Sequence, residues 1–134
     1  MNGRPTQPHR KILVVGDDKS LTRVLGIALS SQGYTVQTAN DGVQGLVRVK
    51  SWHPDLVMCD LAMPHMDGFA FLSRMRCFTD VPVIILSGEK GLLIDSAVIA
   101  AGANLFVRKP FEMKALDEAI SSQLANTGAA SVHH

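Results

Sequence analysis

Five polar side chains follow short apolar runs of this chain, and their types suit the handling of an anion beside a metal ion. Asp17 and Asp18 come after the first run, Asp60 after the third, Ser87 after the fourth and Lys109 after the fifth. Carboxylates that lie close together repel one another and tend to recruit a cation, and hard oxygen ligands favour Mg²⁺ or Mn²⁺. Lysine adds a fixed positive charge and serine a hydroxyl donor. Together these groups predict a site for a phosphoryl group.

The apolar runs predict the strands that would bring these side chains together. They lie at 12–15, 35–39, 56–59, 83–86 and 105–107. Four runs are nearly continuous in Val, Ile and Leu, which is typical of a parallel sheet covered on both faces, whereas the run at 35–39 alternates as an edge strand does. Because the carboxyl ends of parallel strands share one edge, we expect the polar residues to converge there.

The segments between the runs carry helical patterns. Apolar residues at helical spacing, with Gly or Pro near the ends, predict helices at 18–32, 43–52, 67–76, 90–101 and 112–124. Five strand–helix units in succession predict an α/β domain with a doubly wound five-stranded parallel sheet and five helices. We expect a disordered segment at 1–10, one folded domain at 11–124 and a flexible tail at 125–134, whose final two histidines are native residues or a tag remnant.

Composition narrows the possible classes of protein. The chain of 134 residues is the size of one domain, and its hydrophobic content of 46% excludes a disordered or fibrous chain. A formal net charge of +1 predicts no direct binding to nucleic acid, and no stretch reads as a leader or membrane span. Cys59 and Cys77 are isolated, which favours free thiols over a disulfide or a zinc site. We therefore expect a cytoplasmic protein with no membrane partner.

Four motifs, taken together, resemble the receiver domains of bacterial response regulators. They are Val-Gly-Asp-Asp at 15–18, Asp-Leu-Ala-Met-Pro-His-Met-Asp-Gly at 60–68, Leu-Ser-Gly at 86–88 and Phe-Val-Arg-Lys-Pro-Phe at 106–111. The resemblance covers residues 11–124 in order, and its specificity lies in the combination. It implies two-component signalling and a flavodoxin-like fold with strand order 2-1-3-4-5, similar to chemotaxis regulators.

The resemblance implies that Asp60 is the phosphorylation site. The donor would be a phosphohistidine on a sensor histidine kinase or a histidine phosphotransfer protein, and the product an aspartyl phosphate. Mg²⁺, with Mn²⁺ as an alternative, would be bound by Asp60, by Asp18 directly, by Asp17 through water and by the backbone carbonyl of Ala62. Apart from its own phosphorylation and slow self-dephosphorylation, such a domain is a signalling phosphoacceptor and not an enzyme.

The resemblance also implies how phosphorylation is transmitted. Lys109 would pair with the phosphoryl group, Ser87 would shift toward it, and Phe106 would turn inward as the serine moves. The surface of the fourth helix, fifth strand and fifth helix would then change and control an output domain, an effector protein or a second copy of the chain. Pro110 would follow a cis peptide bond, with a trans turn as the plain alternative.

Each of these residues also has a purely structural explanation. The acidic pair could cap the first helix, Asp60 could form a turn, Ser87 could be a loop hydroxyl, Phe106 a core aromatic and Lys109 a surface lysine. We favour the functional interpretation because these separate accidents would have to coincide at one edge of the sheet.

Two further groups of residues are predicted to adjust the function. Ala62, Gly88 and Glu89 would lie beside the site and modulate the lifetime of the phosphoryl group, which we expect to be intermediate. Leu92 and Ile99 would form a second apolar stripe on the fourth helix, opposite its sheet-facing side, and predict contact with a partner or a second copy. The alternative for this stripe is a different helical register.

Other classes of function fit the sequence less well. A haloacid-dehalogenase-like phosphatase that uses Mg²⁺ would need a second Asp two residues after Asp60, where this chain has Ala62. An FMN-binding protein would need a Ser/Thr- and Gly-rich phosphate loop after the first strand, where this chain has two aspartates. A receiver-like interaction module that signals without phosphorylation remains open, as does the choice between a single-domain regulator and part of a longer one.

Overall fold

One parallel sheet organises the protein, whose computed structural model describes residues 10–63, 65–88 and 92–132. Its strands are β1 (Lys11–Val15), β2 (Thr35–Ala39), β3 (Leu56–Asp60), β4 (Val83–Ser87) and β5 (Leu105–Arg108), in the order β2-β1-β3-β4-β5. The helices that alternate with them are α1 (Lys19–Ser31), α2 (Gly42–Trp52), α3 (Gly68–Met75), α4 (Leu92–Ala100) and α5 (Met113–Val132). The predicted fold class, the strand order and the edge position of β2 are confirmed.

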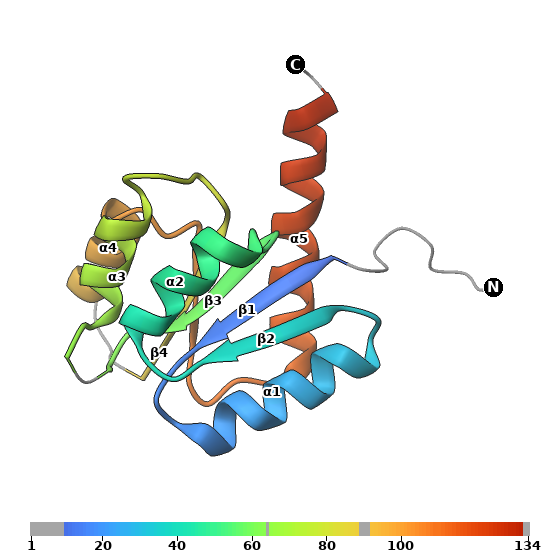
Figure 1. Ribbon diagram of the computed structural model, residues 1–134, viewed down its shortest axis with the longest axis horizontal. Helices are drawn as coiled ribbons and strands as arrows, with labels where there is room; N and C mark the ends of the chain where they lie inside the picture. Colours follow the sequence, from blue (N-terminus) through green and yellow to red (C-terminus); the bar gives the residue numbers. More distant parts are fainter. Residues whose placement is uncertain (1–9, 64, 89–91, 133–134) are drawn as a thin grey trace.

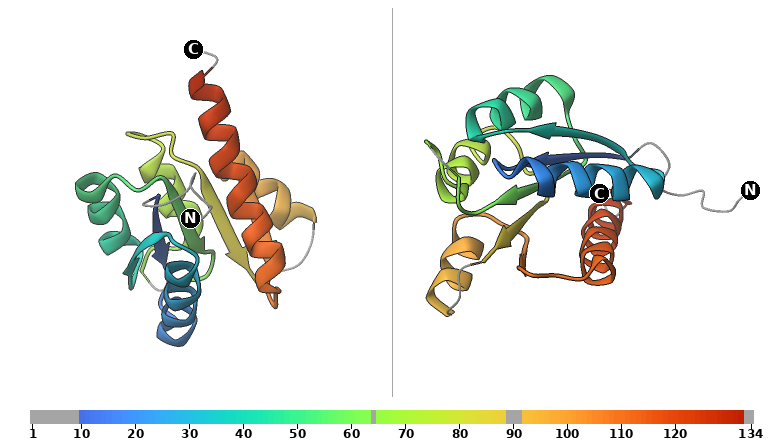
Figure 2. Two further views of the ribbon diagram at one scale, coloured as in Figure 1. Left: turned by 90° about the vertical axis from the view of Figure 1, so that its right-hand side faces the viewer. Right: turned by 90° about the horizontal axis from the view of Figure 1, so that it is seen from below.

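Helices cover both faces of this sheet (Figure 1 and Figure 2). α1 and α5 pack on one face, and α2, α3 and α4 pack on the other. Because side chains alternate along a strand, Ile12 and Val14 of β1 join the core beneath α1 and α5, while Leu13 and Val15 join the opposite core. Packing on two faces explains why the strands are apolar at successive positions.

Aspartates begin the first three helices. Asp18, Asp41 and Asp67 are the N-cap residues of α1, α2 and α3, and each side chain accepts a hydrogen bond from a backbone N–H three residues later. Such a bond satisfies an amide that has no partner inside the helix. The predicted helix starts at 18 and 67 therefore fall on the caps, one residue before the helices themselves.

The ends of several elements differ from the predicted positions. β3, β4 and β5 each continue one residue further than predicted, so that Asp60 and Ser87 are the last residues of their strands. α5 continues past 124 to Val132, because the expected tail is rich in Ala and contains no Pro, a composition that permits helix. Residues 1–9 and the final two histidines, predicted to be flexible, lie outside the described residues. In the described part of the chain, no helix is long and apolar enough to cross a membrane.

Arg76, the C-cap residue of α3, holds the loop between α4 and β5. Its guanidinium donates to the carbonyl of Gly102 at 3.0 and 2.8 Å, to the carbonyl of Val81 at 2.8 Å and to the side-chain oxygen of Asn104 at 3.0 Å. Burial lowers the pKa of this guanidinium. The amino end of β5 is thereby fixed to α3. This contact lies at the amino ends of the strands, away from the predicted site at their carboxyl ends.

Candidate functional site

Asp60 and Lys109 form an ion pair at the carboxyl edge of the sheet. Asp60 ends β3, and only 8% of its side chain is exposed. The Nζ atom of Lys109 lies 2.8 Å from Oδ1 and 2.9 Å from Oδ2 of this carboxylate. A buried carboxylate is costly unless a countercharge and hydrogen bonds accompany it, and Lys109 supplies both. The pair therefore fixes the orientation of the Asp60 carboxylate.

Lys109 directly follows β5, a strand that is not adjacent to β3, the strand of Asp60. β4 lies between β3 and β5, and the backbone N–H of Lys109 donates to the carbonyl of Ser87 at 2.8 Å, which extends the ladder one residue past β5. The side chain of Lys109 then crosses the end of β4. The predicted cis peptide bond before Pro110 is present. The fold thus brings residues from β3, β4 and the segment after β5 to one edge.

Ser87 is the contribution of β4 to this edge. It is buried, with 3% of its surface exposed, and the register places it one residue beyond Leu86, the partner of Asp60. The next residue, Gly88, is exposed, and a Cβ atom there would meet no atom of the described residues within 4 Å. Glu89, predicted to modulate the site, lies outside the described residues.

The acidic pair Asp17 and Asp18 follows the end of β1, which passes close to Asp60, and both acidic side chains are exposed. A Cβ atom on Gly16 would lie 3.5 Å from Cβ and 3.8 Å from Oδ2 of Asp60, so the end of β1 passes close to that carboxylate. Asp17 and Asp18 are both exposed. Asp17 lines an open cleft of about 490 Å³ together with Ala62. Asp18 caps α1, so the capping role considered for this pair is confirmed for Asp18.

The donors near Asp60 suit a hard cation, although they are not assembled as a complete ligand set. Within residues 10–63, 65–88 and 92–132, no group of three or more His, Cys, Asp and Glu side chains is arranged to hold a metal ion. The predicted ligands are nevertheless carboxylates and a backbone carbonyl, the donors that Mg²⁺ prefers. Asp17 is exposed in the same cleft as Ala62, so its side chain has room to turn. The residues present therefore fit Mg²⁺ by donor chemistry.

Phe106 and Arg108 connect β5 to α4. Phe106 is partly buried against the core, and the guanidinium carbon of Arg108 lies 5.6 Å from the centroid of its ring. Arg108 also forms an ion pair with Asp95 of α4. Sequence reasoning missed this pair, because an acid and a base 13 residues apart carry no signal until α4 packs beside β5.

Of the two residues predicted to form a second apolar stripe on α4, only the side chain of Ile99 belongs to the described part of the chain. Val98 is buried and Ile94 packs against the core, whereas Ile99 is 44% exposed. Ala97, which precedes the buried Val98, is exposed, so the side of α4 that faces the core is narrow. The side chain of Leu92 lies outside the described residues.

Cys59 precedes Asp60 and is fully buried. Burial raises the pKa of its thiol, and the negative charges of Asp60 and Asp67 raise it further. Its Sγ–H group donates to the backbone carbonyl of Asp60 at 3.3 Å. Cys59 is thus a neutral core thiol that packs beneath the site, whereas Cys77 is exposed.

Comparison with known proteins identifies one family. The family model described as response regulator receiver domain matches residues 12–121. "Probable transcriptional regulator ycf27" of Cyanophora paradoxa is 38% identical over 118 residues, which cover 88% of this chain and 49% of that protein. "DNA-binding response regulator MtrA" of Mycolicibacterium paratuberculosis is 33% identical over 116 residues, which cover 87% of this chain and 52% of that protein. The chain spans about half the length of these curated relatives.

Solved structures share the fold over nearly their whole length. The receiver domain of the Francisella response regulator 1452 superimposes with a TM-score of 0.85 at 26% identity, covering 89% of this chain and 99% of that chain. The chemotaxis protein CheY4 of Vibrio cholerae superimposes with a TM-score of 0.82 at 28% identity, covering 86% of this chain and 98% of that chain.

Proposed function

Because this chain belongs to the response regulator receiver domain family, we propose that it is a signalling phosphoacceptor whose Asp60 takes a phosphoryl group from a phosphohistidine. The observation that supports this proposal most strongly is the pairing of both Asp60 carboxylate oxygens with Lys109 at the carboxyl edge of the sheet. The donor protein would be a sensor histidine kinase or a histidine phosphotransfer protein.

The proposed transfer needs positioning and charge rather than elaborate chemistry. An oxygen of Asp60 forms a bond to phosphorus while the bond between phosphorus and the donor's imidazole nitrogen breaks, and the imidazole leaves with that electron pair. Lys109 already faces both oxygens of the nucleophile, so its ammonium offsets negative charge on the transferred group. In the proposed reaction, the hydroxyl of Ser87 at the same edge would donate a hydrogen bond to a phosphoryl oxygen.

Divalent cation binding belongs to the same proposal. Asp60, Asp18 and the carbonyl of Ala62 would hold Mg²⁺ directly and Asp17 would hold it through water, with Asp18 releasing its bond to the amide of Leu21. The cation would supply positive charge for the phosphoryl oxygens in addition to that of Lys109.

Signal output would pass through β5 and α4. Phe106 lies beside Arg108, and Arg108 is paired with Asp95, so a movement of the aromatic ring would alter the contact between the two elements. The surface of α4, β5 and α5, including Ile99, would then bind an output domain, an effector or a second copy. The dimeric option is tested by molecular mass with a phosphoryl mimic, and an unchanged mass in wild type and Ile99→Asp would exclude it.

We also propose which partners the full protein would have. Some relatives are named as DNA-binding regulators, and this chain matches about half of their length. A separate output domain would supply DNA binding in such proteins, so we still expect no direct nucleic-acid contact from the receiver. A matching histidine kinase would be identified by phosphotransfer profiling against purified kinases.

The lifetime of the phosphoryl group is proposed to be intermediate. Ala62 has no side-chain group that could orient an attacking water, and Gly88 leaves the neighbouring space open. Glu89, two residues after Ser87 in the sequence, could position or repel water. A half-life of a few seconds or of many hours would contradict this expectation.

The central test is covalent labelling. Incubation with acetyl phosphate and Mg²⁺ should add the mass of one phosphoryl group to the wild-type protein and none to Asp60→Asn. Asp80→Asn is a matched control, since Asp80 is exposed and precedes β4, at the amino ends of the strands and away from the site. Absence of an adduct in wild type would support a phosphorylation-independent interaction module, and an adduct that persists in Asp60→Asn would place the acceptor elsewhere.

A further inference from the structure

We infer that the open edge of β2, with the groove beside it, is a docking site for an extended acidic segment of a partner protein, which would add a strand to the sheet. β2 and β5 occupy opposite edges of the sheet, and β1 separates β2 from the strand that carries Asp60. The inference therefore does not depend on the proposed phosphorylation.

Backbone groups of β2 are directed away from the sheet. Among the described residues, β1 is the one strand that pairs with β2, so its other side is an edge. The N–H of Thr35 and the carbonyl of Ala39 bond toward β1 at 2.9 and 3.0 Å. Since successive residues of a parallel strand bond to opposite sides, the N–H and C=O groups of Val36 and Thr38 face the open edge. Such groups are a template for an added strand.

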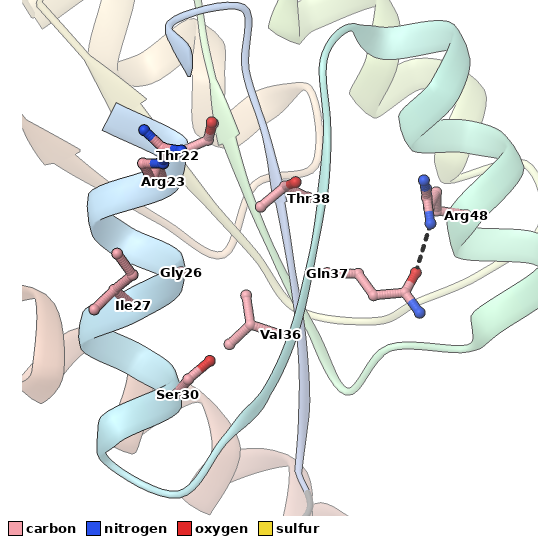
Figure 3. Close-up of a pocket in the computed structure, with 9 residues that line it drawn as sticks. All are labelled: Thr22, Arg23, Gly26, Ile27, Ser30, Val36, Gln37, Thr38 and Arg48. Atoms are coloured by element: carbon pink, nitrogen blue, oxygen red, sulfur yellow. Dashed lines mark hydrogen bonds between the residues drawn. The ribbon is translucent and has the colours of Figure 1, made fainter. Parts of the chain in front are cut away.

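An open groove of about 620 Å³ lies along this edge (Figure 3). Arg23 and Ile27 line it from α1, Val36 from β2 and Arg48 from α2. In Figure 3, Val36 points toward α1, whereas Gln37 points toward α2, where Arg48 donates to its side-chain oxygen at 2.9 Å. The groove therefore combines an apolar floor with a guanidinium on each side of the strand.

Apolar side chains are exposed on the two helices that flank the edge. Val24 and Ile27 of α1 are 58% and 66% exposed, and Val43 and Val47 of α2 are 55% and 61% exposed. Of these four residues Ile27 lines the groove, so its side chain is the one that an added strand would cover.

The charge of this region specifies the partner. Two charged side chains line the groove, those of Arg23 and Arg48, and both are basic. The aspartates that cap α1 and α2, Asp18 and Asp41, are not among its lining residues. A second copy joined edge to edge would bring these like charges together, whereas a segment with Glu or Asp at successive positions, whose side chains point to both faces of the sheet, would pair with both arginines. An acidic strand from another protein is therefore the occupant we assign.

The test uses a defined peptide and the full chain. We would titrate ¹⁵N-labelled protein with the capped peptide Val-Glu-Glu-Val-Glu-Glu-Val, which presents Glu on both faces of an added strand, and with a control peptide in which Lys replaces each Glu. The acidic peptide should shift the amide signals of Val36 and Thr38 and slow their hydrogen exchange, because their N–H groups would gain acceptors. The Lys peptide should leave both signals unchanged.

Variants separate the contributions of charge and backbone. Arg23→Glu/Arg48→Glu should weaken binding of the acidic peptide roughly tenfold and allow the Lys peptide to bind, because two exposed ion pairs would become like-charge contacts. Arg74→Glu, on the exposed side of α3, is the matched control and should change nothing. Thr38→Pro removes one outward N–H while the ladder to β1 stays intact, and it should also weaken binding.

Three results would overturn the inference. The first is equal affinity of the acidic peptide for wild type and the double arginine variant, or no binding to either. The second is a set of shifts confined to α4 and α5. The third is a dimer in sedimentation that Thr38→Pro dissociates, because the edge would then belong to a second copy. Circular dichroism would verify that each variant is folded.

Discussion

The two central strands and the β5–α4 region contribute to the same site but are packed differently. Every residue of β3 and β4 is buried, whereas all four residues of β5 are partly exposed. The first region supplies Asp60 and Ser87, and the second leads to Phe106 and Lys109. A group that must be held still is therefore built into the densest part of the core, while groups that respond to it lie where local rearrangement costs less free energy.

The β5–α4 region is attached to the rest of the domain at a few polar points. Arg76 holds the loop before β5 at the amino edge, Arg108 pairs with Asp95 of α4, and Lys109 pairs with Asp60. The amino end of β5 is thus anchored by several hydrogen bonds to one guanidinium, and its carboxyl end by two ion pairs. Movement of this region should occur at the carboxyl end, next to the site.

The largest expected effect is the loss of stability on truncating a buried phenylalanine. We compare it with truncation of a partly exposed phenylalanine in β5. Phe71 is fully buried between α2 and α3, where its ring would lie 2.9 Å from a Cβ atom on Gly45. Phe71→Ala should lower the free energy of unfolding by about 3–5 kcal/mol, because it removes apolar contacts and leaves a cavity. Phe106→Ala, at a partly exposed position, should cost about 1–2 kcal/mol. Urea denaturation of both variants would measure this, and equal losses would remove the contrast between the regions.

A second prediction concerns the attachment of the amino end of β5. Arg76→Ala should lower the free energy of unfolding by about 2–3 kcal/mol, because several carbonyl groups lose a charged donor. It should also speed amide exchange in the loop around Gly102. Arg74→Ala, an exposed residue of the same helix, should change the free energy by less than about 0.5 kcal/mol. If both variants behaved alike, Arg76 would not be the anchor of this region.

The smallest expected effect is a pH dependence of the free energy of unfolding that arises from Cys59 in β3. The pKa of the Cys59 thiol is raised by burial, so the folded protein keeps a proton that the unfolded chain releases in mildly alkaline solution. The unfolded state then binds fewer protons, and the free energy of unfolding should fall by about 1.4 kcal/mol per pH unit above roughly pH 8.5. Unfolding measured from pH 8 to 10 should show this extra slope in wild type relative to Cys59→Ala.

The exposed cysteine provides the control for that measurement. Cys77→Ala should keep the wild-type slope, because Cys77 lies at the surface. Identical slopes in wild type and Cys59→Ala would mean that the Cys59 thiol ionises in the folded protein, and hence that water reaches β3.

Much of the site was predictable because its residues occur at strand ends. Continuous apolar runs revealed the buried strands, and parallel strands place their carboxyl ends together, so Asp60, Ser87 and Lys109 could be expected at one edge. The predicted ends of several elements differ by one residue from the observed ends. At the start of α1 the reason is that a capping residue such as Asp18 looks helical in the sequence. The end of α5 was placed too early, because a weakly apolar helix has no strong periodic signal.

The sequence by itself determined the fold class, the strand order through its family motifs, and the identity of the residues at the carboxyl edge. Local patterns suffice for these features, because apolar spacing and caps act over a few neighbouring residues. Only the tertiary structure decided that Lys109 spans the end of β4 to hold both oxygens of Asp60, that Arg108 pairs with Asp95, and that Asp18 caps α1 instead of turning toward Asp60. It also revealed the basic groove beside β2, because these contacts join residues distant in sequence, whose separation no local pattern encodes.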